Sequence, residues 1–211
     1  MRPDVAPVAD RHRERILGRV RDALRGRPPV AHPGPFESWR PRSAPEPSPV
    51  ALFTTMLESA GGEVVRVAGG DDARAWLAGF STDFASAACG ETLPAELRPL
   101  LPSAPADAAP LGVSLARGAV AETGSLLLDA RDGRRAQLLP PTHVVMVHAD
   151  AVHATFRDAL LALRDDLPSA IGLHSGPSKS ADIGHIMVKG VHGPGRLIAV
   201  VIGAAEGALP P

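Results

Sequence analysis

Four short polar motifs carry most of the side chains in this sequence that could do chemistry. All four lie in the second half of the 211-residue chain, and each sets glycine or proline beside a carboxylate, hydroxyl, imidazole or ammonium group. They are residues 121–125 (AETGS), 140–143 (PPTH), 175–182 (SGPSKSAD) and 190–194 (GVHGP). Each follows or precedes an apolar stretch that predicts a buried strand. We therefore expect the motifs at the ends of a sheet, where open α/β sheets build ligand sites.

Glu122 is the candidate for a reacting group. It lies between Val120 and Gly124, at a predicted bend that leaves a buried strand. A carboxylate there could accept a proton or attack an acyl group. It could equally accept hydrogen bonds from main-chain amides and fix the turn. Both interpretations stay open, and the neighbouring Thr123 and Gly124 are predicted to line the same ligand site.

The PPTH motif places Thr142 and His143 at the start of a predicted strand. The two prolines remove main-chain donors and stiffen the entry to that strand, so a purely structural turn also explains the motif. The functional interpretation is that the Thr142 hydroxyl and the His143 imidazole face a ligand. The sequence leaves the cis or trans state of the proline bonds open.

The SGPSKSAD motif follows a predicted strand and precedes a predicted helix over residues 181–188. The free N–H groups of a helix start, the nearby hydroxyls and the Lys179 ammonium could converge on a phosphate or carboxylate. The motif lacks the pattern of a Walker phosphate loop. A serine that merely caps the helix is the structural alternative. The predicted ligand residues are Ser175, Gly176, Ser178, Lys179 and Asp182, the last in the first helical turn.

The GVHGP motif returns the chain to the last predicted strand, which its glycines and proline explain without a ligand. His192 is its one candidate for chemistry, and we expect that it could approach His143 at the sheet edge. The histidines and carboxylates do not form a compact metal-ligand spacing, so no metal site is predicted. The glycines near residue 70 lack the full dinucleotide fingerprint, so a nicotinamide or flavin cofactor is not predicted either.

The elements that position these motifs alternate between strand and helix. Strands are predicted at residues 63–67, 85–89, 111–115, 125–129, 143–147, 170–174 and 197–202, and helices at 51–60, 71–79, 94–101, 151–164 and 181–188. Such alternation predicts a largely parallel sheet covered by helices. The expected fold class is therefore α/β, with a Rossmann-like sheet and flanking helices.

The start of the chain differs from the remainder in composition. Residues 10–25 form an expected amphipathic helix with Asp10 as its N-cap, and a proline-rich stretch follows. The predicted domains are residues 1–48, a helix and a proline-rich strap, and residues 49–211, an α/β domain. The arginines of the first helix could form a contact surface, although such charge is usually just solvated.

Composition limits the partners and the compartment. A formal net charge of -1 and 3% aromatic residues argue against nucleic-acid binding. The sequence contains no 18-residue apolar run, so no membrane span is expected, and its charged start does not resemble a secretory signal. Cys89 is the one cysteine, so neither a disulfide nor an iron–sulfur cluster is expected in this chain. These features favour the cytoplasm.

Taken together and in this order, the four motifs resemble the lactate-utilisation family that is called the LUD domain. The elements that carry the resemblance are AETG at 121–124, LPPTH at 139–143, SGPSKSADI at 175–183 and GVHGP at 190–194. The likeness extends from residues 57–64 to the last strand and is tightest over 112–194. Any one motif alone would be weak, but the ordered set is specific.

The resemblance implies a fold similar to the sugar-phosphate isomerase and coenzyme A transferase group. It also implies a subunit role in oxidising L-lactate to pyruvate, with partner subunits that carry the iron–sulfur clusters. The motif residues would then bind a small carboxylate or phosphate-bearing ligand. The alternative is a stand-alone enzyme of coenzyme A transferase or sugar-phosphate type that uses Glu122 as nucleophile or base.

Overall fold

The computed structural model of the chain describes residues 8–27, 48–181 and 187–204. Contacts divide the chain into two units, Met1–Ala44 and Pro45–Pro211. In the first unit, α1 (Val8–Leu24) is a helix with exposed apolar side chains at Ile16 and Val20. The prediction that Asp10 caps this helix is wrong, because Val8 and Ala9 already belong to the first turn. Most of the predicted proline-rich strap lies outside the described residues, and the boundary at residue 48 stays a prediction.

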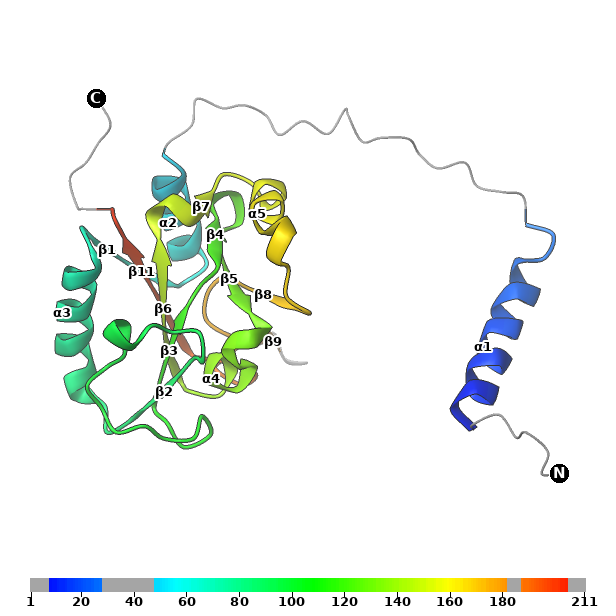
Figure 1. The fold of residues 1–211 in the computed structure, drawn as a ribbon, viewed down its shortest axis with the longest axis horizontal. Helices are drawn as coiled ribbons and strands as arrows, with labels where there is room; N and C mark the ends of the chain where they lie inside the picture. Colours follow the sequence, from blue (N-terminus) through cyan, green and yellow to red (C-terminus); the bar gives the residue numbers. More distant parts are fainter. Residues whose placement is uncertain (1–7, 28–47, 182–186, 205–211) are drawn as a thin grey trace. The chain divides into compact units, whose positions relative to one another are not determined.

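The second unit contains a five-stranded sheet in which every neighbouring pair is parallel. The middle strands are long apolar runs, as expected for a parallel sheet that is covered on both faces. This sheet confirms the predicted α/β fold with flanking helices (Figure 1). Its strands, in spatial order, are β1 (Glu63–Val67), β11 (Arg196–Ile202), β6 (Thr142–His148), β3 (Leu111–Leu115) and β2 (Ala87–Cys89).

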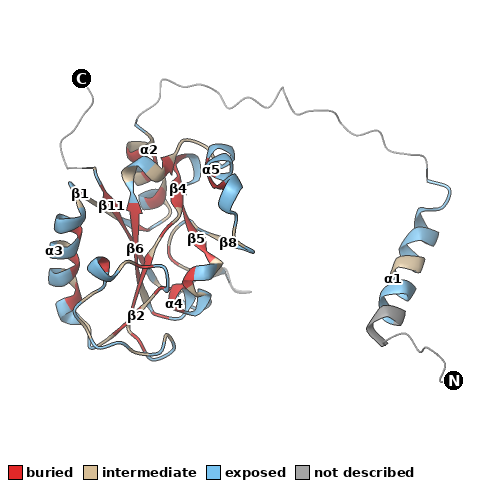
Figure 2. Cartoon of the chain, viewed as in Figure 1, coloured by how far each residue is buried: buried red, intermediate tan, exposed pale blue. Residues whose placement is uncertain are grey.

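Helices cover the two faces of this sheet. On one face, Leu77 of α3 (Gly70–Phe80) shares an apolar cluster with Val144 of β6. On the other face, Phe53 of α2 (Pro49–Ser59) shares a cluster with Val145. Neighbouring residues of β6 thus point to opposite faces, as the two-residue period of a strand requires. In Figure 2 the buried residues follow the strands, while the outer sides of the helices are exposed.

A second sheet, which the sequence did not predict, packs on the same face as α2. Leu126 and Leu128 of this sheet belong to the α2 cluster, whereas Leu127 points to the opposite side and packs with α5 (Phe156–Leu163). The order of its strands is β7 (Val152–His153), β4 (Gly118–Val120), β5 (Ser125–Asp129) and β8 (Ile171–His174). The molecule therefore stacks α3, the large sheet, α2 with the second sheet, and α5.

The predicted helix over 151–164 is shorter than expected. Val152 and His153 pair with β4 as a strand, and the helix begins only at Phe156 because the Thr155 side chain accepts a hydrogen bond from the Asp158 N–H and caps it. The predicted helix over 94–101 is also too long. Only a 3₁₀ turn at Ala95–Leu97 forms there.

The predicted helix over 181–188 is wrong at the positions that the structure describes. Ala181 ends β9 (Lys179–Ala181), and Met187 starts β10 (Met187–Lys189), which pairs antiparallel with β9. The Gly190 N–H donates to the Ser178 carbonyl at 3.0 Å and closes the end of this ladder. Residues 182–186, and with them Asp182, lie outside the described residues.

A short helix, α4 (Arg134–Leu138), precedes the PPTH motif. The described chain contains no cis peptide bond, so both prolines of the PPTH motif follow trans bonds.

Candidate functional site

Three of the four motifs meet at the amino ends of β6 and β11. The Arg196 N–H donates to the Pro141 carbonyl at 3.2 Å, which joins the segment after GVHGP to PPTH. The Ser178 N–H donates to the Pro194 carbonyl at 2.8 Å, which joins SGPSKSAD to GVHGP. The motifs thus lie at the end of the large sheet, as predicted. It is however the amino end, opposite the carboxyl end at which open α/β sheets commonly bind ligands.

A chain of hydroxyl groups connects AETGS to SGPSKSAD. The Thr123 Oγ1 lies 2.7 Å from the Ser125 Oγ, which in turn lies 2.6 Å from the Ser175 Oγ. Ser125 is buried, while Thr123 and Ser175 are exposed. Sequence reasoning missed Ser125. Its signal was a single polar residue at the start of an otherwise apolar strand.

Gly124 and Gly176 let α2 lie directly against these two motifs. Gly124 has φ +60, and a Cβ there would lie 2.7 Å from the carbonyl carbon of Met56. Gly176 has φ +119, and a Cβ there would lie 2.9 Å from the Ala60 oxygen. Both positions therefore favour glycine, because the backbone there has a positive φ and α2 leaves no room for a Cβ. The contact of each glycine with a ligand stays a prediction.

Lys179 is not at a helix start. It lies in β9, and its ammonium group donates a hydrogen bond to the Ala60 carbonyl at the end of α2. The negative end of a helix dipole favours a cation at this place. Among the described residues, no free helix N–H groups surround Lys179, although the lysine itself lies among the motifs.

Ser178 connects the hairpin to His192. The Ser178 Oγ accepts a hydrogen bond from the His192 N–H at 3.4 Å. The imidazole of His192 and the side chain of Lys179 are both exposed. An imidazole and an ammonium group are thus open to solvent on either side of the half-buried Ser178 hydroxyl.

His143 is fully buried between the two sheets. Its Nε2 lies 3.1 Å from the Ser114 Oγ, and its buried Nδ1 has no partner among the described residues. Burial, helped by the nearby His174, lowers the pKa of His143 to about 3. The ring is therefore neutral at pH 7, and it suits hydrogen bonding rather than binding of an anion by charge.

The ring beside His143 belongs to His174, with the two centroids 6.2 Å apart. Sequence reasoning placed His192 there instead. The signal for His174 was the strand period: it lies two residues after Gly172 and opposite Leu126, on the inward face of β8. Burial lowers the pKa of His174 as well. Thr142, also predicted at the site, is half-buried, and its N–H donates to the Pro110 carbonyl at 3.4 Å.

Glu122 is exposed, and its Oε1 accepts a hydrogen bond of 2.8 Å from the Phe156 N–H. Phe156 is the first residue of α5, so the carboxylate satisfies a donor that the helix itself leaves free. This geometry favours the interpretation in which Glu122 accepts hydrogen bonds from the main chain, here at the start of α5. Within the described ranges, no hydrogen bond or ion pair joins Glu122 to Lys179 or His192, and its catalytic role stays a prediction.

Arg117 precedes the AETGS motif and has a structural partner. Its guanidinium lies 2.8 Å from a carboxylate oxygen of Asp166, which Arg131 also contacts at 2.9 Å. Hydrogen bonds from Arg131 and then Arg117 lower the pKa of Asp166 to about 2. This ion pair ties the segment before AETGS to the end of α5 and does not face the motif hydroxyls.

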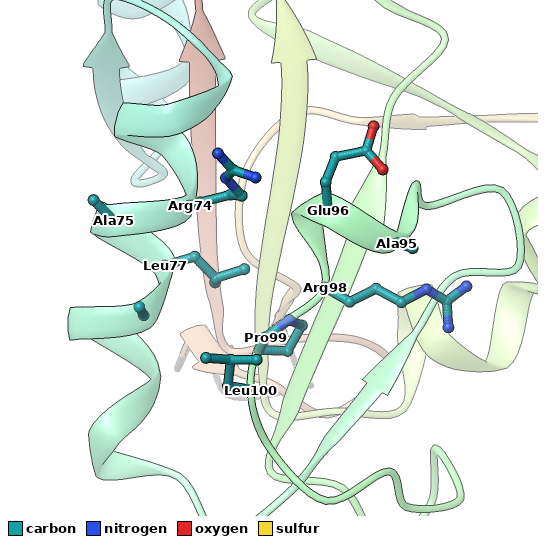
Figure 3. A pocket seen from close by; sticks show the side chains of 9 residues that line it. Arg74, Ala75, Leu77, Ala95, Glu96, Arg98, Pro99 and Leu100 are labelled. Carbon is teal, nitrogen blue, oxygen red and sulfur yellow. The ribbon is translucent and has the colours of Figure 1, made fainter.

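A hollow of about 440 Å³ lies between α3 and residues 95–100 (Figure 3). Leu77 of α3 and Pro99 face each other across it, whereas Arg98 extends away from α3. The Arg74 guanidinium pairs with Asp71, and Arg98 donates to the Gly90 carbonyl at 3.3 Å. Because both of its arginines already have partners and no motif residue lines it, this hollow is not the candidate site.

A second hollow of about 520 Å³ contains Cys89 and Asp132. Burial raises the pKa of the Cys89 thiol, which keeps it protonated and weakens it as a nucleophile. The Asp132 carboxylate accepts from the Thr92 hydroxyl at 2.7 Å and from the Thr92 N–H at 3.1 Å. The thiol and the carboxylate therefore stabilise the fold, and neither is a reactive group that is free to act on a ligand.

Two negative findings apply to the described part of the chain. It holds no group of three histidine, cysteine or acidic side chains that could bind a metal ion. None of its helices is both long and apolar enough to cross a bilayer.

Fold and site together define a class of protein: an α/β domain whose parallel sheet carries a second sheet, with glycine-rich polar motifs gathered at the amino end of the larger one. Residues 104–202 match the family model of the LUD domain. This range contains all four motifs, so the match supports the predicted resemblance to the LUD family over this region.

Curated relatives match part of this chain. Lactate utilization protein C of Deinococcus radiodurans is 39% identical over 90 residues, which cover 40% of this chain and 42% of that protein. Lactate utilization protein C of Macrococcus caseolyticus is 32% identical over 105 residues, 46% of either chain. The matched region thus spans less than half the length of these relatives.

A solved structure shares the fold over most of the chain. A DUF162 family protein from Deinococcus radiodurans superposes with a TM-score of 0.58 and 20% sequence identity, over 74% of this chain and 96% of that one. At this identity the likeness supports the α/β fold alone. The predicted likeness to the sugar-phosphate isomerase and coenzyme A transferase group stays a prediction.

Proposed function

We propose that this chain is a subunit of a system that oxidises L-lactate to pyruvate, and that its motif cluster binds a small carboxylate or phosphate-bearing ligand. The LUD domain match and the name lactate utilization protein C of its relatives support the lactate role. Oxidation of lactate releases two electrons and two protons, so an electron acceptor is needed. Iron–sulfur clusters use several thiolates, and this sequence has one cysteine, so we assign the clusters to partner subunits.

The observation that carries the proposed ligand site is the continuous set of contacts between the motifs. Hydrogen bonds between side-chain hydroxyls join Thr123 to Ser125 and Ser125 to Ser175. A main-chain hydrogen bond joins Ser178 to Pro194. Groups that are held by several elements keep their geometry when a ligand arrives, and this lowers the cost of binding. A set of motifs used only for folding would not need exposed hydroxyl, imidazole and ammonium groups on neighbouring residues.

The first experiment is reduction of a dye that depends on L-lactate. The chain is assayed alone, its co-purifying iron–sulfur partners are assayed alone, and the mixture is assayed at equal concentration. Activity in the mixture only is the expected result, because the chain is assigned no redox group of its own. Activity of the partners that is unchanged by adding the chain would contradict the subunit role.

Complementation separates the subunit role from the ligand site. Deletion should abolish growth on L-lactate, and the wild-type chain should restore it. A chain with Glu122→Ala and Lys179→Ala should fail to restore growth while it remains folded. Full restoration by that double variant would keep the subunit role and reject the ligand site.

The second candidate function is transfer of an acyl group by Glu122. Exposure of this carboxylate favours it, since a nucleophile has to reach its substrate. Incubation of the purified chain with acyl-coenzyme A donors, followed by mass spectrometry, should then yield a modified Glu122. Neither modification nor turnover would reject this function without affecting the lactate role.

A further inference from the structure

The two lysines of this chain lie directly opposite each other. Arginine supplies 20 of the 22 basic side chains, and lysine occurs only at positions 179 and 189. Lys179 of β9 and Lys189 of β10 are register partners in the antiparallel hairpin. The chain uses arginine at its other basic positions, and both of its lysine side chains lie at paired positions of one small hairpin.

This pairing is unfavourable unless something compensates for it. Opposite residues of an antiparallel pair lie on the same face within about 5.5 Å, and like charges there destabilise the ladder. The hairpin has three residue pairs, and all three residues of β10 are exposed, so little buried apolar area offsets the repulsion. Isolated two-stranded hairpins are marginal even without such repulsion.

The end of α2 compensates only in part. The Ala60 carbonyl accepts one hydrogen bond from the Lys179 ammonium group, and the partial charge at a helix end is about half an elementary charge. Two ammonium groups carry two positive charges. The carboxylate of Glu63, at the start of the adjacent β1, is engaged by Arg196 at 2.6 and 2.8 Å. Among the residues that the structure describes, the balance of charge at the hairpin therefore stays positive.

Donors of hydrogen bonds flank the pair. Ser178 precedes Lys179, and its hydroxyl already contacts the main chain of His192. A Cβ on Gly193 would lie 3.3 Å from the Ser178 Cβ, so this loop lies tightly against the start of β9. The exposed imidazole of His192 adds a third polar group three residues after Lys189. Hydroxyl, imidazole and amine groups thus occupy the same end of the hairpin.

The choice of lysine over arginine indicates the kind of ligand. Arginine presents a planar fork, whereas lysine presents a compact charge on a flexible stem. Two such charges on one face can approach one small anion from two sides, with each ammonium group donating to a different oxygen. We propose that Lys179 and Lys189 together bind a single carboxylate or phosphate group, and that the bound anion stabilises the hairpin. This inference rests on the proposed function of the motif cluster and specifies which groups hold the charged end of the ligand.

The presence of only two lysines makes the test direct. Chain that is labelled with ¹³C at the lysine ε carbon gives two signals in a carbon–proton spectrum. These signals are followed while inorganic phosphate, L-lactate or pyruvate is added at constant ionic strength, with sodium chloride as the reference. We expect both signals to shift along one saturating curve for at least one of these anions, and neither to shift with chloride.

Variants test the contribution of each amine. Because each ammonium group donates a charge-assisted hydrogen bond to the anion, Lys179→Ala and Lys189→Ala should each weaken binding at least about ten-fold. The matched control is Arg157→Ala, which removes the same charge from an exposed position on α5. The double variant Lys179→Arg with Lys189→Arg keeps the charge and should also bind more weakly. Circular dichroism checks that each variant retains the fold.

Three outcomes would overturn the inference. They are shifts that chloride reproduces, affinity that survives Lys189→Ala, and an arginine double variant that binds as tightly as the wild-type chain. Lactate-dependent activity in the mixture, combined with no binding at the lysines, would reject the lysine site alone. Binding at the lysines without such activity would reject the lactate role alone. A preference for phosphate over L-lactate would identify a phosphate-bearing ligand, and the reverse preference a carboxylate.

Discussion

The side-chain hydroxyls of Ser125 and Ser175 lie 2.6 Å apart, although 50 positions separate them in the sequence. The pairing of β5 with β8 brings them together, since Leu126 lies opposite His174 one position further along. This bond is the direct link between the AETGS and SGPSKSAD motifs. Ser125 is buried and bonds to both of its neighbours, so it holds the two exposed hydroxyls in place.

Ser125→Ala should lower the free energy of unfolding by about 1 kcal/mol, because both hydrogen bonds of the buried hydroxyl are lost. The matched variant Ser175→Ala should cost less, because Ser125 keeps its bond to Thr123 and Ser175 is exposed. Urea denaturation measures both values. Equal losses in the two variants would show that Ser125 is not the centre of this set of hydroxyls.

Gly124→Ala should destabilise the protein by more than about 2 kcal/mol. The substitution adds a Cβ at φ +60 and forces it to within 2.7 Å of the main chain of α2, which combines backbone strain with overpacking. Gly79→Ala is the control, because nothing lies within 4 Å of a Cβ there. At this exposed position of α3 it should stabilise by up to about 1 kcal/mol. Thermal unfolding should therefore move in opposite directions for the two variants.

Acid should destabilise the protein from about pH 6.5 downward. Burial lowers the pKa of His143 to about 3 from the value of 6.5 that the unfolded chain has. Between these values the unfolded state binds more protons than the folded state, so the free energy of unfolding falls as the pH falls. The lowered pKa of His174 adds to the same trend. One group contributes a slope of at most about 1.4 kcal/mol per pH unit.

The pH effect is measured as the urea midpoint at several pH values between 7.5 and 4.5. His143→Leu should lower stability at pH 7.5, because Ser114 loses its partner, but it should flatten the slope. His148→Asn, at an exposed position of β6, is the control and should leave the slope as it is. An unchanged slope in His143→Leu would mean that the buried ring is not the source of the acid sensitivity.

Glu122→Ala should cost about 1 kcal/mol of stability, since the Phe156 N–H at the start of α5 loses its acceptor. Glu122→Gln keeps a carbonyl oxygen at this place and should recover most of the loss. Glu96→Ala, at another exposed glutamate, should change stability by less than about 0.5 kcal/mol. If Glu122→Gln is stable yet inactive in lactate-dependent dye reduction, the carboxylate acts in the reaction. If it is stable and active, Glu122 is structural.

The parallel sheet could be predicted because its strands are buried on both faces. Residues 143–147 and 197–202 are continuous apolar runs, and such runs indicate a strand without knowledge of the partner. Neither β7 nor β9 has that signal. β7 has two residues and is defined only by its pairing with β4. β9 and β10 consist of small, polar and apolar residues in a mixture that fits a helix equally well, and only their mutual pairing decides the outcome.

The candidate site, like the fold, could be predicted only in part. The motifs could be located from their residue types, and their assembly at a sheet end follows from the strands beside them. The partners of individual side chains could not be predicted, because they come from distant segments. His143 meets His174 from β8, and Lys179 reaches Ala60 at the end of α2. Each of these contacts depends on how the second sheet lies on the first.

The position of β11 between β1 and β6 also has a consequence for synthesis of the protein on the ribosome. β1 pairs only with β11 in the described sheet, and β11 is translated after the other four strands of that sheet. Until β11 is made, the growing chain has unpaired strand edges on both β1 and β6. The apolar residues beside these edges also lack the packing that β11 provides. Open edges of this kind promote association between chains. Nascent chains that stall before Arg196 are therefore expected to depend on chaperones, whereas completed chains can close the sheet themselves.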